Sequence, residues 1–387
     1  MSNAPVTEID PAAFAADPYP ALARMREEAP ITYVPQLGAT LFTRRDDIFT
    51  HEKRIDVFSS DQPSGLLTKV MGANMMRKDG AAHMSERKAL FPALSPRTVR
   101  DRLEAQFAEI VQGHLDRLRP TGRADLVTDF AMPVSADALR VMTGLTNMSA
   151  ADMDAASQAM LDAAANYQRD PAINRRGFGW AETVRDLIAE RLPHLQANPD
   201  HSIISVFDQA GLDLDAIAGN VRVIIGGGQN EPRDAIAGTA WAMLAHPDQH
   251  ALVQGGTHSY ADAFAEYIRL NAPIGMSPRR VARPDREAGV AFEEDDLIFF
   301  MFGSAGRDTA HFDAPDRYDI TRNTQASIAF GAGPHFCAGA AASKTLIAGH
   351  ALPQLFAQLP GLRLAGDVPF HGWAFRGPTT MPVEWDA

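Results

Sequence analysis

The longest periodic segment in the chain is a candidate helix from about Asp213 to Ala245, which ends before Pro247. It exceeds the roughly 8 to 20 residues of an ordinary globular helix. Its middle, residues 226–232 (GGGQNEP), breaks helix propensity, because glycine and interior proline cost about 1 and 3 kcal/mol relative to alanine. Residues that disfavour a helix, placed inside an otherwise regular helix, are typical of a functional site.

The remaining pattern predicts a mainly α fold with a small β-sheet region. Ser95 is a candidate N-cap, Pro96 suits the first helical position, and an apolar face follows them. That face comprises Val99, Leu103, Phe107, Ile110, Val111 and Leu115. Segments 31–34 and 39–44 alternate around a turn at 35–38 and predict a hairpin, and 273–302 predicts small strands. No repeat or linker divides the chain, so we expect one domain over residues 1–387.

Composition excludes several classes of protein. With 45% hydrophobic and 22% charged residues among 387, the chain can bury a large core. A net charge of -12 disfavours a nucleic-acid-binding protein. A single cysteine cannot form an internal disulfide, which fits a reducing, cytoplasmic location. The N-terminus lacks the pattern of a signal peptide, and no apolar run is long enough to predict a membrane anchor.

The single cysteine lies in an unusual segment, residues 330–339 (FGAGPHFCAG). A lone cysteine is usually an inert buried residue. Here Gly331, Gly333 and Gly339 permit a tight loop whose backbone N–H groups can turn toward the sulfur. Such donors, together with a helix that begins just after Cys337, would keep a thiolate deprotonated, as an iron ligand requires.

Phe-Gly-x-Gly-x-His-x-Cys-x-Gly resembles the haem-binding loop of the cytochrome P450 family. The resemblance implies that Cys337 is the proximal ligand of haem b (iron protoporphyrin IX), whose thiolate favours O–O cleavage of bound dioxygen. It also implies that Phe330 shields the sulfur, that Gly331 shapes the loop and that His335 reaches a haem propionate. A cysteine protease is the rival for a Cys–His pair, but a histidine two positions away in a glycine-rich loop does not suit it.

Three further motifs follow the order of the family. Glu266 and Arg269 form a Glu-x-x-Arg, which alone is typical of an exposed helical pair. The resemblance implies instead a buried structural network with a third basic residue, at Arg317. His83 and Arg87 match a His-x-x-x-Arg whose members lie on one helix face and donate to haem propionates. Arg280, beside Arg279, matches a further propionate-binding arginine.

The stretch 226–232 is where the chain departs from the family. The resemblance implies that Gly227 and Gly228 let the helix approach the porphyrin closely. Most members then carry an acid and a threonine that deliver protons to iron-bound dioxygen. Counting back from His246-Pro247 puts Asn230 at the acid position and Glu231 at the threonine position. Pro232 lacks an N–H, which predicts that the Gly228 carbonyl is free to bind water or a ligand.

Glu231 leaves several functions open. It can carry protons in a monooxygenase that inserts one oxygen atom from dioxygen, with electrons from a ferredoxin or flavodoxin and its reductase. It can instead act as general base on hydrogen peroxide in a peroxygenase. A structural alternative has Glu231 facing away and pairing with Arg233 or a backbone donor. A non-enzymatic haem sensor or carrier is the remaining class, which the carboxylate in the distal helix disfavours.

The predicted substrate is a small or medium hydrophobic molecule. The family's substrate-contacting regions map here onto segments rich in Met and Leu, which offer adaptable apolar surface. Stripes of this kind are more often core than pocket. The candidate substrate contacts are Leu67, Met75, Gln229, Ile274 and Met276.

Overall fold

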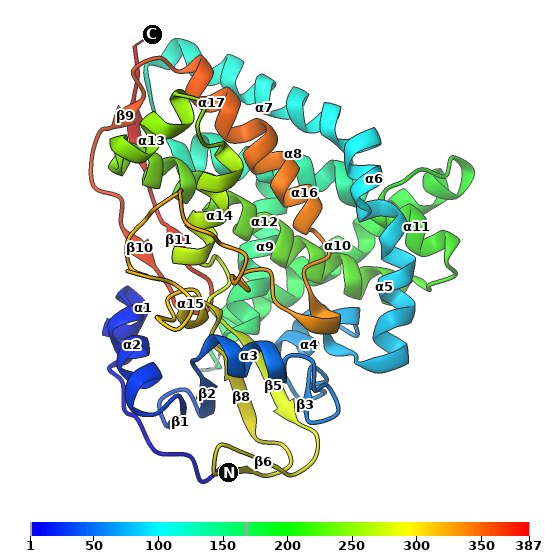
Figure 1. Cartoon of the computed structure of the whole chain (residues 1–387). Coiled ribbons are helices and arrows are strands. Elements are labelled where there is room, and N and C mark those ends of the chain that lie inside the picture. Colours follow the sequence, from blue (N-terminus) through cyan, green and yellow to red (C-terminus); the bar gives the residue numbers. More distant parts are fainter. Residues whose placement is uncertain (1, 167–168, 387) are drawn as a thin grey trace.

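The computed structural model describes residues 2–166 and 169–386, and it shows the expected mainly α fold with small sheets. Figure 1 shows the helices filling most of the molecule, while the largest sheet lies at the end that carries the N-terminus. The C-terminus lies at the opposite end. Within the described residues, no helix is both long and apolar enough to cross a membrane.

Most elements in the described part of the chain are helices. The α-helices are α1 (Pro11–Ala16), α2 (Tyr19–Glu28), α3 (Arg45–His51), α4 (Leu66–Met71), α5 (Gly80–Leu94), α6 (Pro96–Thr98), α7 (Glu104–Leu118), α8 (Met132–Thr143), α9 (Ala150–Ala164), α10 (Pro171–Ala197), α11 (Ile203–Gln209), α12 (Leu214–Ala245), α13 (Pro247–Gln254), α14 (Tyr260–Leu270), α15 (Phe302–Ala305), α16 (Ala340–Lys344) and α17 (Leu352–Gln358). Short 3₁₀ turns are η1 (Met75–Arg77), η3 (Arg119–Thr121) and η5 (Gly333–His335), and π-helical segments are η2 (Val99–Leu103), η4 (Val127–Ala131) and η6 (Thr345–Ala351).

Among residues 2–166 and 169–386, the strands form one five-stranded sheet and three smaller ones. The five-stranded sheet has the order β1-β2-β8-β5-β3. The strands are β1 (Ile31–Val34), β2 (Ala39–Phe42), β3 (Phe58–Ser59), β4 (Arg123–Asp125), β5 (Ser277–Val281), β6 (Asp285–Glu287), β7 (Val290–Phe292), β8 (Leu297–Phe300), β9 (Arg363–Leu364), β10 (Phe370–His371), β11 (Gly377–Pro378) and β12 (Pro382–Glu384). The predicted hairpin is confirmed as the antiparallel pair β1–β2, although its second strand ends at Phe42. The predicted small strands within 273–302 are also present.

Helix α12 runs through the middle of the helical part and has almost the bounds that the sequence predicts. The Asp213 carboxylate accepts a hydrogen bond from the Ala216 N–H at 2.8 Å and so caps its start. The helix stays continuous through the glycines and Pro232 and ends before Pro247. A proline inside a helix leaves a carbonyl without its usual N–H partner, so neighbouring groups must supply one.

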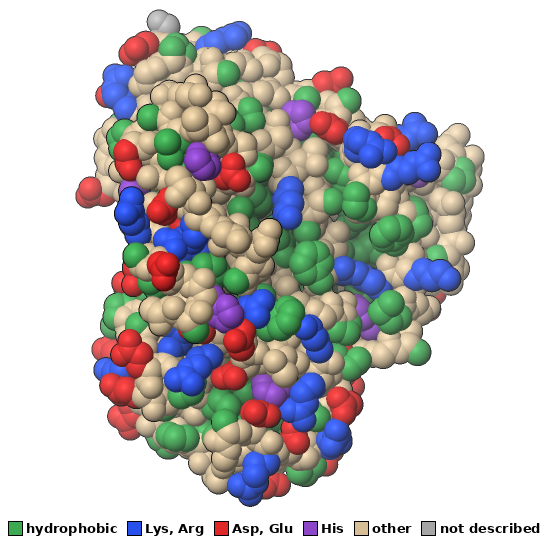
Figure 2. Space-filling model, viewed as in Figure 1, with side chains coloured by type: hydrophobic (Ala, Val, Ile, Leu, Met, Phe, Trp, Pro, Cys, Tyr) green, Lys and Arg blue, Asp and Glu red, His purple; other side chains and the backbone are tan. Residues whose placement is uncertain are grey.

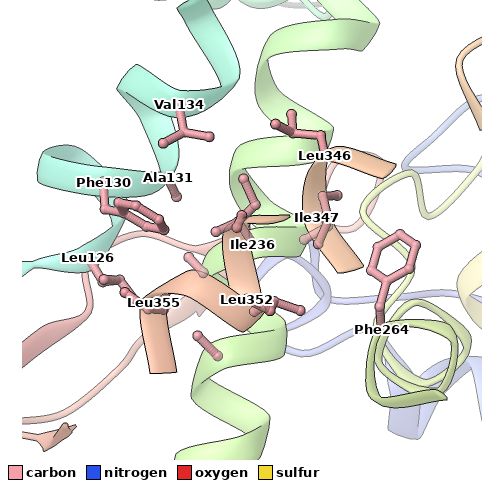
Figure 3. Close-up of a cluster of buried hydrophobic side chains, with 14 of the residues drawn as sticks. Leu126, Phe130, Ala131, Val134, Ile236, Phe264, Leu346, Ile347, Leu352 and Leu355 are labelled. Atoms are coloured by element: carbon pink, nitrogen blue, oxygen red, sulfur yellow. The ribbon is translucent and has the colours of Figure 1, made fainter. Parts of the chain in front are cut away.

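A large hydrophobic core holds α12 in place. Figure 3 shows Ile236 of α12 between side chains of η4 and α8 on one side and of η6 on the other, with side chains of α17 below it. The predicted apolar face after Ser95 contributes to the same core, and Ser95 caps that helix by accepting from the Thr98 N–H at 3.1 Å. The labelled residues of this core are Leu126, Phe130, Ala131, Val134, Ile236, Phe264, Leu346, Ile347, Leu352 and Leu355.

Glu266 and Arg269 form a fully buried ion pair on α14, as the resemblance implies. Arg269 Nε lies 2.7 Å from Glu266 Oε2, and Nη2 lies 2.8 Å from Oε1. Arg269 Nη1 also donates to the carbonyls of Gly306 at 2.6 Å and Pro315 at 2.8 Å. The pair therefore fastens α14 to two loops that precede the cysteine segment.

The third basic residue of this network is Arg322, and the prediction of Arg317 is wrong. Arg322 Nε donates to Glu266 Oε1 at 3.1 Å, and its guanidinium also contacts three backbone carbonyls. The Arg317 side chain is exposed, and only its carbonyl joins the network, accepting from Arg269 at 3.3 Å. The two arginines lie on the same irregular segment, whose turns decide which of them points inward.

Arg322→Ala should destabilise the protein by about 1.5–3 kcal/mol, because it removes a charged hydrogen bond from a buried carboxylate. Arg317→Ala is the matched control and should stay within about 0.5 kcal/mol of wild type, as an exposed substitution does. Urea unfolding followed by circular dichroism measures both. Equal losses of unfolding free energy in the two variants would show that Arg322 contributes no more to the network than Arg317 does.

Candidate functional site

The cysteine segment folds into a tight loop closed by backbone hydrogen bonds. The Cys337 N–H donates to the Phe330 carbonyl at 2.9 Å, and the Gly331 N–H donates to Ile328 at 2.8 Å. Gly331 has a φ of 76° and Gly333 a φ of 65°, a left-handed conformation that favours glycine. The glycines predicted to shape the loop are therefore needed for its backbone path.

The loop surrounds the Cys337 sulfur with groups that favour negative charge. Burial raises the pKa of the Cys337 thiol, whereas hydrogen bonds from the backbone N–H groups of Gly339 and Ala340 and the charge of Arg87 lower it. Helix α16 begins at Ala340 and continues through η6 into α17, so its N-terminus faces the loop. The donors expected from the glycines are therefore present, although the effect of burial is larger and leaves the pKa of the thiol raised.

His335 and His83 lie together beside this loop. Their rings stack with centroids 4.2 Å apart, which joins the cysteine loop to α5. Burial, followed by the charges of His335 and Arg87, lowers the pKa of His83 to about 4. His83 Nδ1 is buried and has no hydrogen-bond partner in the described structure.

Asp79 anchors this histidine pair, and the sequence analysis did not identify it. Its Oδ1 lies 2.8 Å from His335 Nε2, and its Oδ2 accepts from Ser59 Oγ at 2.6 Å and from the Ser60 N–H at 2.8 Å. Burial alone would raise the pKa of Asp79, but these hydrogen bonds lower it to about 2. Its position just before α5, like that of a helix cap, was the available signal.

The two predicted arginines lie on the same side as this cluster. Arg87 donates to the Phe336 carbonyl of the cysteine loop. Arg280 pairs directly with Ser59 across β5 and β3, and residues opposite each other in a sheet share a face. Arg280 therefore shares the face of Ser59, the residue that binds Asp79, although its guanidinium contacts Asp295 and the Asp61 carbonyl. Arg279 points to the opposite face.

Gly227 and Gly228 lie on different sides of α12. A Cβ added at Gly227 would meet nothing within 4 Å, so this glycine borders open space. A Cβ at Gly228 would lie 2.9 Å from Leu139 Cδ1, so this glycine lets α8 pack closely. Of the two, only Gly227 has room for a large ligand beside it.

The Gly228 carbonyl is not free, contrary to the prediction made from Pro232. Ser135 Oγ of α8 contacts the Gly228 carbonyl at 3.3 Å and donates to that of Gln229 at 2.7 Å. Ser157 Oγ of α9 lies 3.2 Å from the Ile225 carbonyl in the same way. The Ser135 hydroxyl thus supplies a donor to the carbonyl that Pro232 leaves without its usual N–H.

Gln229 and Asn230 point into the helical core. The fully buried Gln229 donates to Asp154 Oδ1 at 3.0 Å and to the Met132 carbonyl at 3.3 Å. The Asn230 side chain lies 3.4 Å from Ser157 Oγ. Both side chains are therefore occupied by α8 and α9 rather than directed to the side of Gly227.

Glu231 lies one turn after Gly227 on α12, and both of its carboxyl oxygens are buried without a hydrogen-bond partner among the described residues. Arg233, its expected partner in the structural alternative, instead pairs with Asp234 at 2.8 Å and Asp154 at 3.7 Å. Burial raises the pKa of Glu231 to about 8, and nearby Asp234 adds to the shift. The charge of Glu231 also raises the pKa of Cys337, so the two groups face a common region.

The apolar candidate substrate contacts are spread over three hydrophobic clusters. Leu67 of α4 and Met75 of η1 belong to the cluster that packs on the first half of α12. Ile274 packs with the five-stranded sheet, and Met276 lies with the N-terminal helices. A surface cavity of about 620 Å³ between α5 and α11 has none of these residues in its lining.

Comparisons with known proteins agree with this geometry. The sequence model described as "Cytochrome P450" matches residues 260–345, which contain Glu266, Arg269 and the cysteine loop. Cytochrome P450 107B1 of Saccharopolyspora erythraea is 27% identical over 399 residues, covering 96% of each chain. The cytochrome P450 monooxygenase PikC of Streptomyces venezuelae is 25% identical, covering 96% of this chain and 92% of that protein.

Solved structures show the same fold. The structure of P450BioI in complex with an acyl carrier protein superposes with a TM-score of 0.89 and 21% identity, covering 97% of this chain and all of that one. CalO2 superposes with a TM-score of 0.87 over 98% of this chain and 99% of that one, at 24% identity. The cysteine loop, the match over residues 260–345 and relatives that align along nearly the whole chain make this chain similar to the cytochrome P450 family of haem-dependent monooxygenases, and the shared fold agrees with this.

Proposed function

We propose that Cys337 would hold the iron of haem b, iron protoporphyrin IX, as its thiolate ligand, and that the enzyme inserts one oxygen atom from dioxygen into a small or medium hydrophobic substrate. The observation that carries this proposal is the tight glycine loop around the single cysteine, in which the Cys337 N–H donates to the Phe330 carbonyl at 2.9 Å and a Cβ at Gly339 would lie 3.9 Å from Cys337 Sγ. A buried carboxyl without partners, on Glu231, faces the same region from α12.

The residues present suit this cofactor. A haem carries two propionates, and His83, Arg87, Arg280 and His335 would hold them. The buried His83 Nδ1 lacks a partner, and a propionate oxygen would provide one. Gly227 leaves the space on α12 that a flat porphyrin needs. When bound, the haem supplies an iron that binds dioxygen, and thiolate ligation favours O–O cleavage.

The protein's own residues control charge and protons around that chemistry. The N–H groups of Gly339 and Ala340 hold negative charge on Cys337 Sγ, and Arg87 supports it. Glu231 takes the role that an acid–alcohol pair has in most relatives, because Asn230 is tied to Ser157. With its raised pKa, the Glu231 carboxyl holds a proton near neutral pH and can release it toward the reacting oxygen.

The two carboxyl oxygens of Glu231, which have no hydrogen-bond partner among the described residues, favour a second candidate function, peroxide-driven oxygenation. Ionised Glu231 would accept a proton from one oxygen of hydrogen peroxide and return it to the other. A carboxyl tied up in an ion pair could not do this readily, and Glu231 has no such pair among the described residues.

For the monooxygenase, we propose that a ferredoxin or flavodoxin docks over the cysteine loop. Exposed Met84, Lys88 and Phe91 lie on one face of α5, and exposed Phe336 lies in the loop that α5 contacts. Figure 2 shows hydrophobic and basic side chains side by side over the region between α16 and α5. An apolar surface with a basic rim suits an acidic partner, although the whole chain has a net charge of -12.

Relatives point to hydrophobic substrates. One relative is named 6-deoxyerythronolide B hydroxylase, and the superposed P450BioI structure contains a fatty acyl group on its carrier protein. The mixed Leu and Met surface around α4 and η1 would suit such apolar compounds. A saturable shift of the Soret band on binding would identify a compound suitable for turnover.

Turnover with isotopically labelled dioxygen tests the proposed function. With a ferredoxin, its reductase and a compound that shifts the Soret band, we expect one labelled oxygen atom in the product, because the second leaves as water. Product formed only when hydrogen peroxide is supplied would replace this function with the peroxygenase. No oxidised product with either oxidant would contradict both and indicate a haem carrier.

Peroxide-driven turnover should rise with pH between about 6 and 9, because the base is the ionised form of Glu231 and its pKa is raised to about 8. Asp234 and Cys337 oppose ionisation of Glu231, while Arg233 favours it. Glu231→Gln should lower the rate by about 10²–10⁴ and remove the rise. Initial rates across pH measure this.

Asp154→Asn is the matched control for that experiment, since it removes a carboxylate from α9 that is not among the main causes of the raised pKa of Glu231. It should keep the rise with pH. A Glu231→Gln variant with the rate and pH profile of wild type would rule out the general-base role.

A further inference from the structure

Glu52 is a buried carboxylate that touches the cysteine loop from a distant part of the chain. It follows α3 directly and is only 2% exposed. Its Oε2 accepts a hydrogen bond from the Ala332 N–H at 2.6 Å, across 280 positions of sequence. Its Oε1 accepts from Arg279 Nη2 at 2.7 Å.

The contact falls where the loop turns most sharply. Ala332 lies between Gly331 and Gly333, the two left-handed glycines. A Cβ at Gly331 would lie 3.3 Å from Glu52 Oε2, and one at Gly333 would lie 3.1 Å from the Glu52 carbonyl. Glu52 therefore packs directly against both turns, and a larger side chain at either glycine would push it away.

Arg279 fixes the other end of this contact. Its Nη1 donates to Ser277 Oγ at 2.5 Å and to the Pro278 carbonyl at 2.9 Å, and its guanidinium lies 5.7 Å from the Phe300 ring. Burial raises the pKa of Glu52, but Arg279 and the Ala332 N–H oppose this shift. The five-stranded sheet, Arg279, Glu52 and the loop are thus linked by charge-assisted hydrogen bonds.

We propose that Glu52 is a positioning residue for the Cys337 thiolate, an inference that rests on the proposed haem ligation. Glu52 holds the 331–333 turn, and this turn presents the Phe330 carbonyl to the Cys337 N–H at 2.9 Å. With the turn fixed, the sulfur stays under the N–H groups of Gly339 and Ala340 that stabilise its charge. Without Glu52 the turn loosens, and the sulfur no longer keeps one fixed position under those N–H groups.

The haem-loaded protein tests this through its ligand spectrum. In the reduced carbon monoxide complex, thiolate and thiol ligation absorb at different wavelengths. Glu52→Ala should raise the thiol-to-thiolate ratio after mild heating roughly tenfold, the effect of losing one charge-assisted hydrogen bond. Hydrogen exchange of the loop peptide around Ala332 should also become faster. Glu52→Gln keeps one acceptor for the Ala332 N–H, so it should lie between wild type and Glu52→Ala.

Asp308→Asn is the matched control, because Asp308 is a buried carboxylate that accepts from the Arg45 N–H at 2.9 Å, at the other end of α3. It should lower the unfolding temperature without changing the thiol fraction. If Glu52→Ala does not fold, Glu52→Gln replaces it in the comparison. The proposal is overturned if the thiol fraction in the Glu52 variant equals that of an equally destabilised Asp308→Asn. A wild-type protein without thiolate ligation would instead refute the haem ligation itself.

Discussion

The proposed haem ligation depends on keeping negative charge on the Cys337 sulfur. Burial raises the pKa of Cys337, so the charge needs donors fixed close to it. The loop provides them only while its backbone follows one path through Gly331 and Gly333. Several contacts from distant parts of the chain hold that path. Glu52 binds the turn, Asp79 binds His335, and the Glu266–Arg269 pair fastens the preceding segment to α14.

On the opposite side of the site, helix α12 is stabilised by contacts from neighbouring helices. Helix α12 carries three glycines and a proline, yet it stays regular because hydroxyls from α8 and α9 reach its carbonyls. The same neighbours occupy Gln229 and Asn230. Glu231 is left buried, unpartnered among the described residues and with a raised pKa. A structure that stabilises the irregular helix from outside but leaves this carboxyl unsatisfied is typical of a functional position.

Local sequence patterns predicted the turns, helix ends and loops whose conformation depends on neighbouring residues in the chain. Turn residues and alternation located the β1–β2 hairpin, capping located Ser95, apolar periodicity located the start of α12 near Asp213, and the glycines around Cys337 indicated the loop. Contacts between distant segments could not be predicted in this way. Arg322 rather than Arg317 meets Glu266 because of how an irregular segment turns, and Ser135 closes the Gly228 carbonyl from another helix. Glu52 and Asp79 carry no motif, and the apolar substrate candidates divide among three clusters.

The absorption spectrum of the reduced carbon monoxide complex tests the central claim, that Cys337 binds the haem as a thiolate, most directly. Wild type should show the red-shifted Soret band of thiolate ligation. Cys337→His should still bind haem, through imidazole, and should lose that band completely. A wild-type spectrum without the band, or a variant that retains it, would contradict the account.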